Sequence, residues 1–240
     1  MKKRLFLVVV LVVLATLLTQ FSLNLDTNFV SYTVNPKDQN VGMYWKNEQN
    51  INFGSLQNLK LWLNKNNKDL LFAMNGGMYK KDKSPQGLYI ENKSKKSNID
   101  TTSGNGNFYL KPNGIFFLTT NNEAHICKTT NYNENAKVKF ATQSGPMLVV
   151  DGEIHKAFNK NSTNLNIRNG VGILPNNEIL FAMSKEEINF YEFAEYFQKK
   201  GCKNALYLDG FVSRTYCPKQ EWTQIDGDFG VIIGVTKNKK

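Results

Sequence analysis

Short apolar runs that end in small or polar residues recur along the chain, and they constrain its fold more than any other feature. Residues 114–118 (GIFFL) predict a buried strand, and residues 146–155 (PMLVVDGEIH) predict a hairpin that turns at Asp151-Gly152. Residues 171–183 (VGILPNNEILFAM) predict a second hairpin, and residues 230–235 predict the last strand. Strands therefore dominate the chain.

Two segments with helical periodicity interrupt these strands. Residues 54–68 place leucines at helical spacing behind a Ser55 cap. In residues 184–200, Ser184 is followed three residues later by Glu187, which predicts a capping box. The apolar stripe of this second segment consists of Ile188, Tyr191, Ala194 and Phe197. Because each helical segment is closely linked to a strand, the sequence predicts an α+β fold with a mixed, strand-rich sheet and two main helices.

Length and charge limit the classes of protein that fit. The chain has 240 residues, of which 41% are hydrophobic, and this suits a single domain after an N-terminal apolar segment. The formal net charge of +10 favours anionic partners such as phosphate, acidic glycans or anionic lipid. No basic-aromatic stripe or zinc-finger spacing is present, so nucleic-acid binding is not expected.

The N-terminus carries a targeting pattern. Three cations at positions 2–4 precede an apolar run over residues 5–18. This predicts a signal peptide or an N-terminal membrane anchor over residues 1–25, followed by one domain over residues 26–240. Both alternatives stay open, since no clean cleavage site follows and the run is short for a span of roughly 20 residues. Cations before the run predict an extracytoplasmic location for the domain, with membrane contact possible through the segment.

The cysteines and histidines do not form a recognisable framework. Cys127, Cys202 and Cys217 fit neither a disulfide-rich scaffold nor a metal cluster. In an oxidising compartment Cys202 and Cys217 are the better candidates for a disulfide, and three buried or free thiols are the alternative. His125 and His155 do not lie near a spaced pair of acids, so the sequence predicts no metal cluster and no cofactor.

Four apolar strands carry small and polar residues directly at their ends. Each of these places is by itself compatible with an ordinary turn, because Gly takes positive φ and Asp bonds its own backbone. Gly-Gly also lets backbone N–H groups approach a ligand, and Asn supplies both a donor and an acceptor. Ser144 does not stand in a G-x-S-x-G elbow, so a serine triad is disfavoured. The four places are Asn75-Gly76-Gly77, Gln143-Ser144-Gly145, Arg168 and Asp209-Gly210.

Six blocks follow one another between Phe72 and Ser213: FAMNGGMY, SPQGLYIE, GNFYLKPNGIF, ATQSGPMLVVDGEIH, NGVGI and NALYLDGFVS. As a set they resemble the phosphodiester glycosidase family. Its animal member is the uncovering enzyme, which removes N-acetylglucosamine from a mannose-phosphate diester, and its bacterial members are often named as exopolysaccharide biosynthesis proteins. Where the family often reads LDGG, this chain has Phe211 in place of the second glycine.

The resemblance implies a hydrolase that cleaves the bond from a sugar anomeric carbon to a phosphodiester oxygen in cell-surface or extracellular glycans. Ordinary glycosidases use two carboxylates, but a phosphate monoester leaves easily, so one carboxylate and a phosphate cradle suffice. From residue type and position, the catalytic candidates are Asp209 as the carboxylate, Arg168 as a phosphate clamp and Ser213 in the same pocket. The substrate-binding candidates are Asn75, Gly76, Gly77, Gln143, Ser144, Gly145, Gly210 and His155.

Two other hypotheses stay open. An extracytoplasmic glycan-binding or polysaccharide-assembly protein would use the same pocket without turnover, and a membrane-attached scaffold would depend only on residues 1–25. Asp209 together with Asn75 offers oxygen atoms to a hard cation. The expected partner is a phosphorylated glycan or a sugar 1-phosphodiester, and the sequence does not indicate the oligomeric state.

Overall fold

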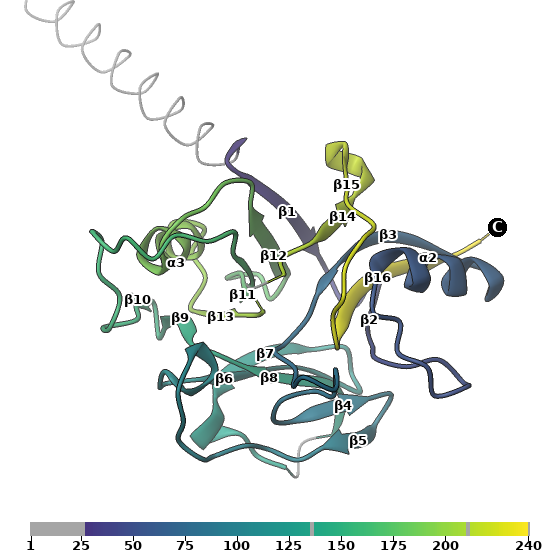
Figure 1. Cartoon of the computed structure of the whole chain (residues 1–240), viewed down its shortest axis with the longest axis horizontal. Helices are drawn as coiled ribbons and strands as arrows, with labels where there is room; N and C mark the ends of the chain where they lie inside the picture. The colour runs from purple at the N-terminus through teal and green to yellow at the C-terminus, as the bar shows by residue number, and fades with distance from the viewer. Residues whose placement is uncertain (1–26, 135–136, 210–211, 240) are drawn as a thin grey trace, which may run out of the picture.

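The computed structural model describes residues 27–134, 137–209 and 212–239 (Figure 1). The predicted signal peptide or anchor over residues 1–25 lies outside the described residues, and so does Gly210. Within the described ranges, no helix is long and apolar enough to cross a membrane.

Strands make up most of the described structure. The two α-helices of the described residues are α2 (Leu56–Lys65) and α3 (Phe190–Lys199), and short 3-10 helices lie at Asn107–Tyr109, Thr129–Asn131 and Pro218–Gln220. The strands are β1 (Phe29–Val34), β2 (Asn40–Tyr44), β3 (Lys68–Asn75), β4 (Tyr89–Glu91), β5 (Ser94–Ser97), β6 (Gly114–Thr119), β7 (Ala124–Lys128), β8 (Val138–Ser144), β9 (Met147–Val150), β10 (Glu153–Ile154), β11 (Asn169–Ile173), β12 (Ile179–Ser184), β13 (Asn204–Tyr207), β14 (Thr215–Cys217), β15 (Trp222–Thr223) and β16 (Ile232–Asn238).

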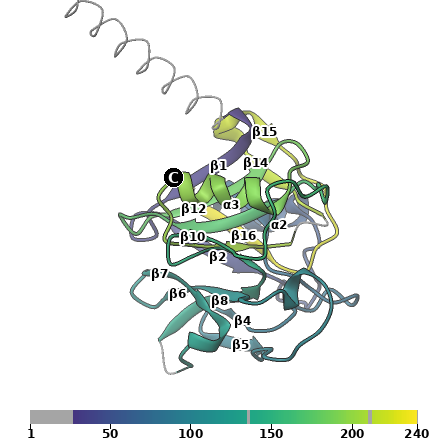
Figure 2. The ribbon, with the colours of Figure 1, turned by 90° about the vertical axis from the view of Figure 1, so that its left-hand side faces the viewer.

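These strands form three sheets. The six-stranded sheet has the order β1-β12-β11-β13-β9-β10. The second sheet, here called the β3 sheet, has the order β15-β14-β3-β16-β2, and the third, the β8 sheet, has the order β5-β4-β8-β6-β7. Figure 2, in which α3 faces the viewer, shows the β8 sheet as a separate layer below the other strands.

The strand-rich fold with two helices is confirmed, with β structure dominating, but the expected mixed sheet is wrong. Every strand pair within the described ranges is antiparallel. The physical reason lies in the connection through α3, which joins β12 to β13. Both strands pair with β11, one on each side, so they run parallel to each other without being neighbours. The connection through α3 therefore crosses over β11, and the two parallel strands that it joins are not neighbours in the sheet.

One aromatic cluster joins the three sheets. Phe181 of the six-stranded sheet stacks on Phe72 of the β3 sheet, with ring centroids 5.4 Å apart. The same ring meets Phe116 of the β8 sheet edge-on at 6.0 Å. All three side chains are fully buried, and each contributes about 2 kcal/mol through burial. The central core therefore lies between the sheets, and it holds them in a fixed arrangement.

The two helices cover outer faces of different sheets, on opposite sides of the molecule (Figure 1). Leu59 and Leu63 of α2 pack with Ile232 of the β3 sheet. Phe193 and Phe197 of α3 pack with the six-stranded sheet in a second cluster. The apolar periodicity of each helix therefore marks the face that a sheet buries.

The first helix agrees with its prediction, and the second begins later than expected. The hydroxyl of Ser55 caps α2 by accepting from Asn58 N. The capping box of α3 is made by Asn189 and Glu192. Ser184, the expected cap, is instead the last residue of β12. The buried face of α3 accordingly consists of Phe193, Ala194, Tyr196 and Phe197.

Both predicted hairpins are confirmed. β9 and β10 pair across Asp151-Gly152, whose φ angles of 54° and 91° fit a primed two-residue turn. β11 and β12 form the second hairpin. The predicted strand over residues 114–118 is β6, and the last strand is β16, which starts two residues later than predicted.

The cysteines are free thiols, so the candidate disulfide is wrong for this structure and the alternative of three thiols holds. Cys202 packs in the cluster under α3, whereas Cys217 packs in the central core. A disulfide between Cys202 and Cys217 would need the strands next to them, β13 and β14, to pair with each other. They do not pair, because β13 belongs to the six-stranded sheet and β14 to the β3 sheet. Burial raises the pKa of Cys202 to about 12 and that of Cys127 to about 11.

Candidate active site

The polar ends of three strands from two sheets meet at one edge. Asn75 at the end of β3 donates from Nδ2 to the carbonyl oxygen of Asp209 at 2.6 Å, and Asp209 N donates to Gly76 O at 3.1 Å. Asn169 at the start of β11 donates from Nδ2 to Asn75 O and Oδ1, both at 2.9 Å. Leu208 N in turn donates to Asn169 O at 3.1 Å. Asp209 is therefore held by its main chain at the junction of both sheets.

The segment between β8 and β9 reaches the same neighbourhood. Tyr207 N, two residues before Asp209, donates to Pro146 O at 3.0 Å. Gly77 lies so close to β8 that a Cβ there would collide with Thr142 Oγ1 and come within 2.8 Å of Gln143 O. The four polar strand ends singled out in the sequence are thus neighbours in space.

Two tyrosines lie close to the carboxylate of Asp209, which is half-buried. Burial, reinforced by the negative charge of Asp209, raises the pKa of Tyr79 to about 12. Burial raises the pKa of Tyr207 to about 12 as well, and Arg168 and Asp209 act on that phenol with opposite signs. Both phenols therefore stay protonated at neutral pH and place no second negative charge beside Asp209.

Two buried polar atoms on these segments have no hydrogen-bond partner among the described residues. They are Ser144 Oγ and Asn169 Oδ1. Buried polar atoms are rarely left unpaired, and both belong to the strand ends that meet near Asp209. Both side chains are fully buried, so these atoms lie beneath the surface of the site. Asn169 was missed in the sequence although it directly follows Arg168.

Gly76 and Gly145, expected to offer amides to a substrate, are used by the fold. Gly76 N donates to Val231 O at 2.7 Å, and a Cβ on Gly76 would lie 2.8 Å from Val231 Cγ1. A Cβ on Gly145 would lie 2.6 Å from Asn113 Cβ. Both glycines therefore permit close packing of the segments that form the site.

Gln143 and Ser213 also hold the protein's own backbone. Gln143 Oε1 accepts from Leu88 N and Asp100 N, both at 2.9 Å, and its Nε2 donates to Asp100 O at 2.6 Å. The Ser213 hydroxyl donates to Ile167 O at 3.1 Å. Their positions next to the site are as expected, and their side chains fix the loops around it.

Arg168 is enclosed within the protein, with an exposed fraction of 0%. Its Nε donates to Ile188 O at 2.8 Å, its Nη2 donates to Asn164 O at 2.9 Å, and its guanidinium lies 3.7 Å from the centre of the Phe190 ring. Burial lowers the pKa of Arg168, although the group stays protonated at neutral pH. Its charge acts on the site through Tyr207, the second residue before Asp209.

Replacement of Arg168 by lysine is expected to lower stability more than turnover. An ammonium cannot reproduce the planar fork or the stacking on Phe190, so the free energy of unfolding should fall by about 2 kcal/mol. For a domain of this size the Tm should fall by roughly 4–8 °C, measured by calorimetry. Arg214→Lys, at a partly exposed arginine, is the matched control and should leave the Tm nearly unchanged. An unchanged Tm with lost turnover in Arg168→Lys would instead favour a direct contact between Arg168 and substrate.

Arg214 is a second arginine at the site, and the sequence analysis missed it. Its main-chain N–H donates to Asn75 Oδ1 at 2.9 Å, and its Nε donates to both carboxylate oxygens of Asp226 at 2.9 Å. Nη1 donates to Ser213 O at 3.0 Å. The side chain is 35% exposed, so a ligand can reach its guanidinium. Arg214 directly follows the last of the six sequence blocks, and this position could have marked it as a site residue.

His155 is buried and holds a loop. Its Nδ1 accepts from Ala157 N at 3.2 Å, so Nε2 carries the proton and donates to Lys111 O at 3.1 Å. The ring stacks on Phe158 at 4.7 Å. Burial lowers the pKa of His155, which favours this neutral form. The contacts of His155 link the loop after β10 to Lys111, and none of them reaches Asp209.

The lowered pKa of His155 predicts a loss of stability in acid. Below pH of about 6.5 the His155 ring binds a proton in the unfolded chain more readily than in the folded protein. The contribution of the neutral ring to the free energy of unfolding is therefore complete above that pH and declines as the pH falls. The decrease in Tm between pH 7 and pH 5 should be smaller in His155→Gln than in the wild type. His125→Gln, at an exposed histidine, should retain the wild-type profile. Equal slopes in all three proteins would contradict the prediction.

The oxygen atoms offered to a hard cation in the sequence analysis have other partners in the structure. No group of three or more His, Cys, Asp or Glu side chains lies together in the described part of the chain. Asn75 Oδ1, one of the oxygens offered to a hard cation, already accepts from Asn169 Nδ2 and Arg214 N.

The comparison with known families covers the whole of this site. The model of the phosphodiester glycosidase family matches residues 68–231, a range that contains all four polar strand ends. The chain belongs to the phosphodiester glycosidase family. The chain is 37% identical over 187 residues to the uncharacterized protein YigE of Escherichia coli K12, covering 78% of this chain and 73% of that protein. Membership assigns the chain to a family of hydrolases.

Solved structures show the same fold at low sequence identity. The catalytic domain of zebrafish N-acetylglucosamine-1-phosphodiester α-N-acetylglucosaminidase, auto-inhibited by its pro-peptide, has a TM-score of 0.57 at 12% identity, covering 87% of this chain and 83% of that one. A putative exported protein of Burkholderia pseudomallei has a TM-score of 0.55 at 9% identity, covering 86% and 73%. At such identities the similarity concerns the fold.

Proposed function

We propose that this member of the phosphodiester glycosidase family hydrolyses a sugar 1-phosphodiester at the bond between the anomeric carbon and the phosphodiester oxygen. Water supplies the new hydroxyl group of the sugar, and the phosphate leaves as a monoester that keeps the bridging oxygen. The observation that carries the proposal is the 2.6 Å contact between Asn75 Nδ2 and Asp209 O. It joins two separate sequence blocks of the family beside a half-buried carboxylate.

The residues around Asp209 fit this chemistry. The Asp209 carboxylate takes a proton from the attacking water or stabilises positive charge at the anomeric carbon. Arg214 offers an accessible guanidinium to the phosphate, and its Nε is held by Asp226. Because the phosphate is a good leaving group, a second carboxylic acid is not required. Arg168 has a positioning role behind Tyr207.

The proposed substrate class and location rest on charge, on a structural neighbour and on the N-terminal pattern. The formal charge of +10 favours an acidic or phosphorylated glycan. The zebrafish structural neighbour is named for a sugar 1-phosphodiester, which supports the same class of bond here. The cationic and apolar N-terminal pattern supports an extracytoplasmic domain over residues 26–240, behind a signal peptide or anchor at residues 1–25.

The experiment mixes the purified chain with the methyl phosphodiester of N-acetylglucosamine 1-phosphate in water labelled with ¹⁸O. We expect release of reducing sugar together with unlabelled methyl phosphate, because the carbon–oxygen bond breaks. Label in the phosphate would reveal cleavage at phosphorus and contradict the proposal. Saturable binding of this diester and of UDP-N-acetylglucosamine without any release would favour the glycan-binding alternative.

A further inference from the structure

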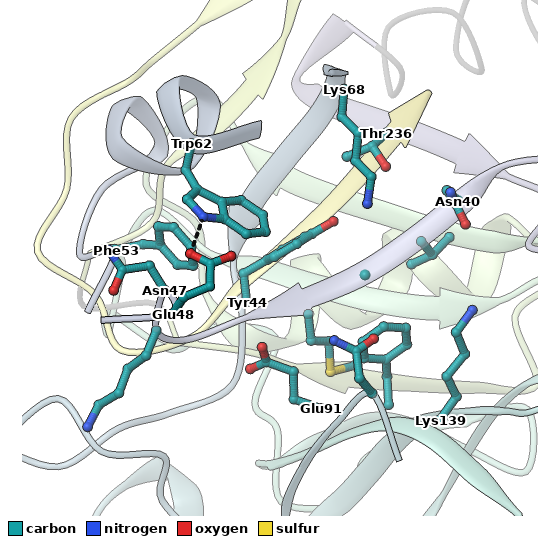
Figure 3. Close-up of a pocket in the computed structure, with 16 residues that line it drawn as sticks. Asn40, Tyr44, Asn47, Glu48, Phe53, Trp62, Lys68, Glu91, Lys139 and Thr236 are labelled. Carbon is teal, nitrogen blue, oxygen red and sulfur yellow. Dashed lines mark hydrogen bonds between the residues drawn. The ribbon is translucent and has the colours of Figure 1, made fainter. Parts of the chain in front are cut away.

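A cavity of about 460 Å³ lies along β2, the edge strand of the β3 sheet (Figure 3). β16 lies between β2 and β3, the strand that ends at Asn75. None of the residues found to hold Asp209 lines this cavity. The cavity is therefore distinct from the candidate active site, and its volume is within the range of small-molecule sites, about 300–1,000 Å³.

Aromatic rings form one wall of this cavity. The rings of Tyr44 and Trp62 lie 6.1 Å apart, and those of Phe53 and Trp62 lie 5.3 Å apart. A Cβ on Gly42 would come within 2.7 Å of the Tyr44 hydroxyl oxygen, so glycine at this position leaves room for that ring. A neighbouring hollow of about 550 Å³ shares Glu48, Phe53 and Trp62 with the cavity. The aromatic surface therefore continues beyond a single small pocket, as an extended ligand requires.

Carboxylates in fixed positions line the same cavity. Glu48 Oε2 accepts from Trp62 Nε1 at 2.8 Å, which fixes the orientation of the indole. Glu91 Oε2 accepts from the hydroxyl of Tyr89 at 2.7 Å, and burial raises the pKa of Glu91. Figure 3 shows the Glu91 carboxylate on the side of the cavity that faces Tyr44. Carboxyl groups held in this way suit the hydroxyl groups of a sugar.

Lysines bring positive charge to the cavity. Lys68 and Lys139 extend toward β2 from two sides in Figure 3, and Lys46 also lines the cavity. In the ranges that the structure describes, neither Lys68 nor Lys139 forms an ion pair. Lys139 Nζ lies 3.5 Å from Asn122 Oδ1 and 5.5 Å from the centre of the Phe140 ring. Three lysines and two glutamates therefore leave the cavity with excess positive charge, ready for an anionic ligand.

We propose that this cavity is a second glycan-binding site, distinct from the hydrolytic centre, which takes a sugar ring that carries a phosphate or a carboxylate. The aromatic wall receives the apolar face of the ring, the carboxyl groups accept its hydroxyls, and Lys68 and Lys139 bind the anion. The choice of a glycan over other anions rests on the proposed function. A glycan held at both places would raise the local concentration of its diester at Asp209.

The test uses the full chain and measures binding directly. N-acetylglucosamine 1-phosphate, glucuronic acid and uncharged N-acetylglucosamine are titrated while the indole N–H signal of Trp62 is followed by NMR. The signal is assigned with Trp62→Phe. The probe variant is Lys68→Gln/Lys139→Gln, and the charge-matched control is Lys156→Gln/Lys219→Gln, at exposed lysines that do not line the cavity.

We expect at least one anionic sugar to shift the Trp62 signal saturably, and the probe variant to weaken that binding at least 10-fold. The control should bind as the wild type does, and all proteins should cleave the small methyl phosphodiester equally well. The two anionic probes tell a phosphate ligand from a carboxylate ligand. Equal affinity in probe variant and control, tighter binding of the uncharged sugar, or no shift with any probe would overturn the inference. Because binding is read at Trp62, absence of hydrolysis would refute only the proposed function.

Discussion

Replacement of Asp209 by asparagine is expected to lower kcat for a sugar 1-phosphodiester by about 1,000-fold, in line with the loss of a general base or charge-stabilising carboxylate. The fold should survive, because the hydrogen bonds that join Asp209 to Gly76 and Asn75 use main-chain atoms of Asp209. Asp209 N donates to Gly76 O, and Asp209 O accepts from Asn75 Nδ2. Neither bond depends on the carboxylate. Kinetics of sugar release and thermal unfolding on the same preparation measure both effects.

Two further aspartates provide controls for this substitution. Asp226→Asn weakens the ion pair with Arg214 and should lower kcat/KM by less than 10-fold. Asp151→Asn removes an exposed ion pair with Lys128 at a hairpin turn and should leave the kinetics unchanged and the Tm nearly so. Turnover of Asp209→Asn within 10-fold of the wild type would show that another group supplies the catalytic carboxylate.

Local patterns in the sequence predicted local structure well. The turn at Asp151-Gly152 and the cap at Ser55 depend on residues within a few positions, and both are present. The distribution of strands over three sheets depends on partners far apart in sequence, such as Phe72 and Phe181, whose rings stack in the core. A strand's own sequence carries no information on which distant strand it pairs with, so a single mixed sheet was expected where three antiparallel sheets form.

The start of α3 shows how tertiary contacts choose between two equivalent local signals. Ser184 with Glu187 and Asn189 with Glu192 both have the spacing of a capping box. The hydroxyl of Ser184 accepts from Arg168 N at 2.9 Å across the β11–β12 hairpin and is therefore engaged in the sheet. Asn189 is left to cap the helix. The sequence contained the correct signal, but it could not rank the two.

The neighbourhood of the four polar strand ends could be predicted from the sequence, but the contacts of their side chains and amides could not. The four polar strand ends share one neighbourhood, as the sequence led us to expect. Gly76 N nevertheless donates to Val231 O, and Gln143 Nε2 donates to Asp100 O. The guanidinium of Arg168 stacks on the ring of Phe190. These contacts join residues 22 or more positions apart, beyond the reach of any motif. Whether a polar group faces substrate or backbone is decided by such distant partners.

Replacement of Asn75 by alanine is expected to lower both stability and activity. Asn75 is 1% exposed, and its side chain connects the two sheets at the site. Without it, the N–H of Arg214 and the carbonyl of Asp209 each lose a partner, whereas Asn169 Nδ2 keeps Asn75 O as an acceptor. Two partly buried groups left unpaired should lower the free energy of unfolding by about 3 kcal/mol. For a domain of this size the Tm should fall by roughly 6–12 °C.

Activity should fall as well, even at temperatures where the variant is folded. Asn75 Nδ2 fixes the main chain of Asp209, so its loss frees the carboxylate from the geometry that the reaction requires. We expect kcat/KM to fall by about 100-fold at 15 °C, where circular dichroism shows whether the fold is retained. Asn176→Ala, which removes two exposed hydrogen bonds with Glu178, should change neither property. A stable and fully active Asn75→Ala would mean that Asp209 is positioned by its strand alone, and that the contact between the two sheets is not part of the catalytic arrangement.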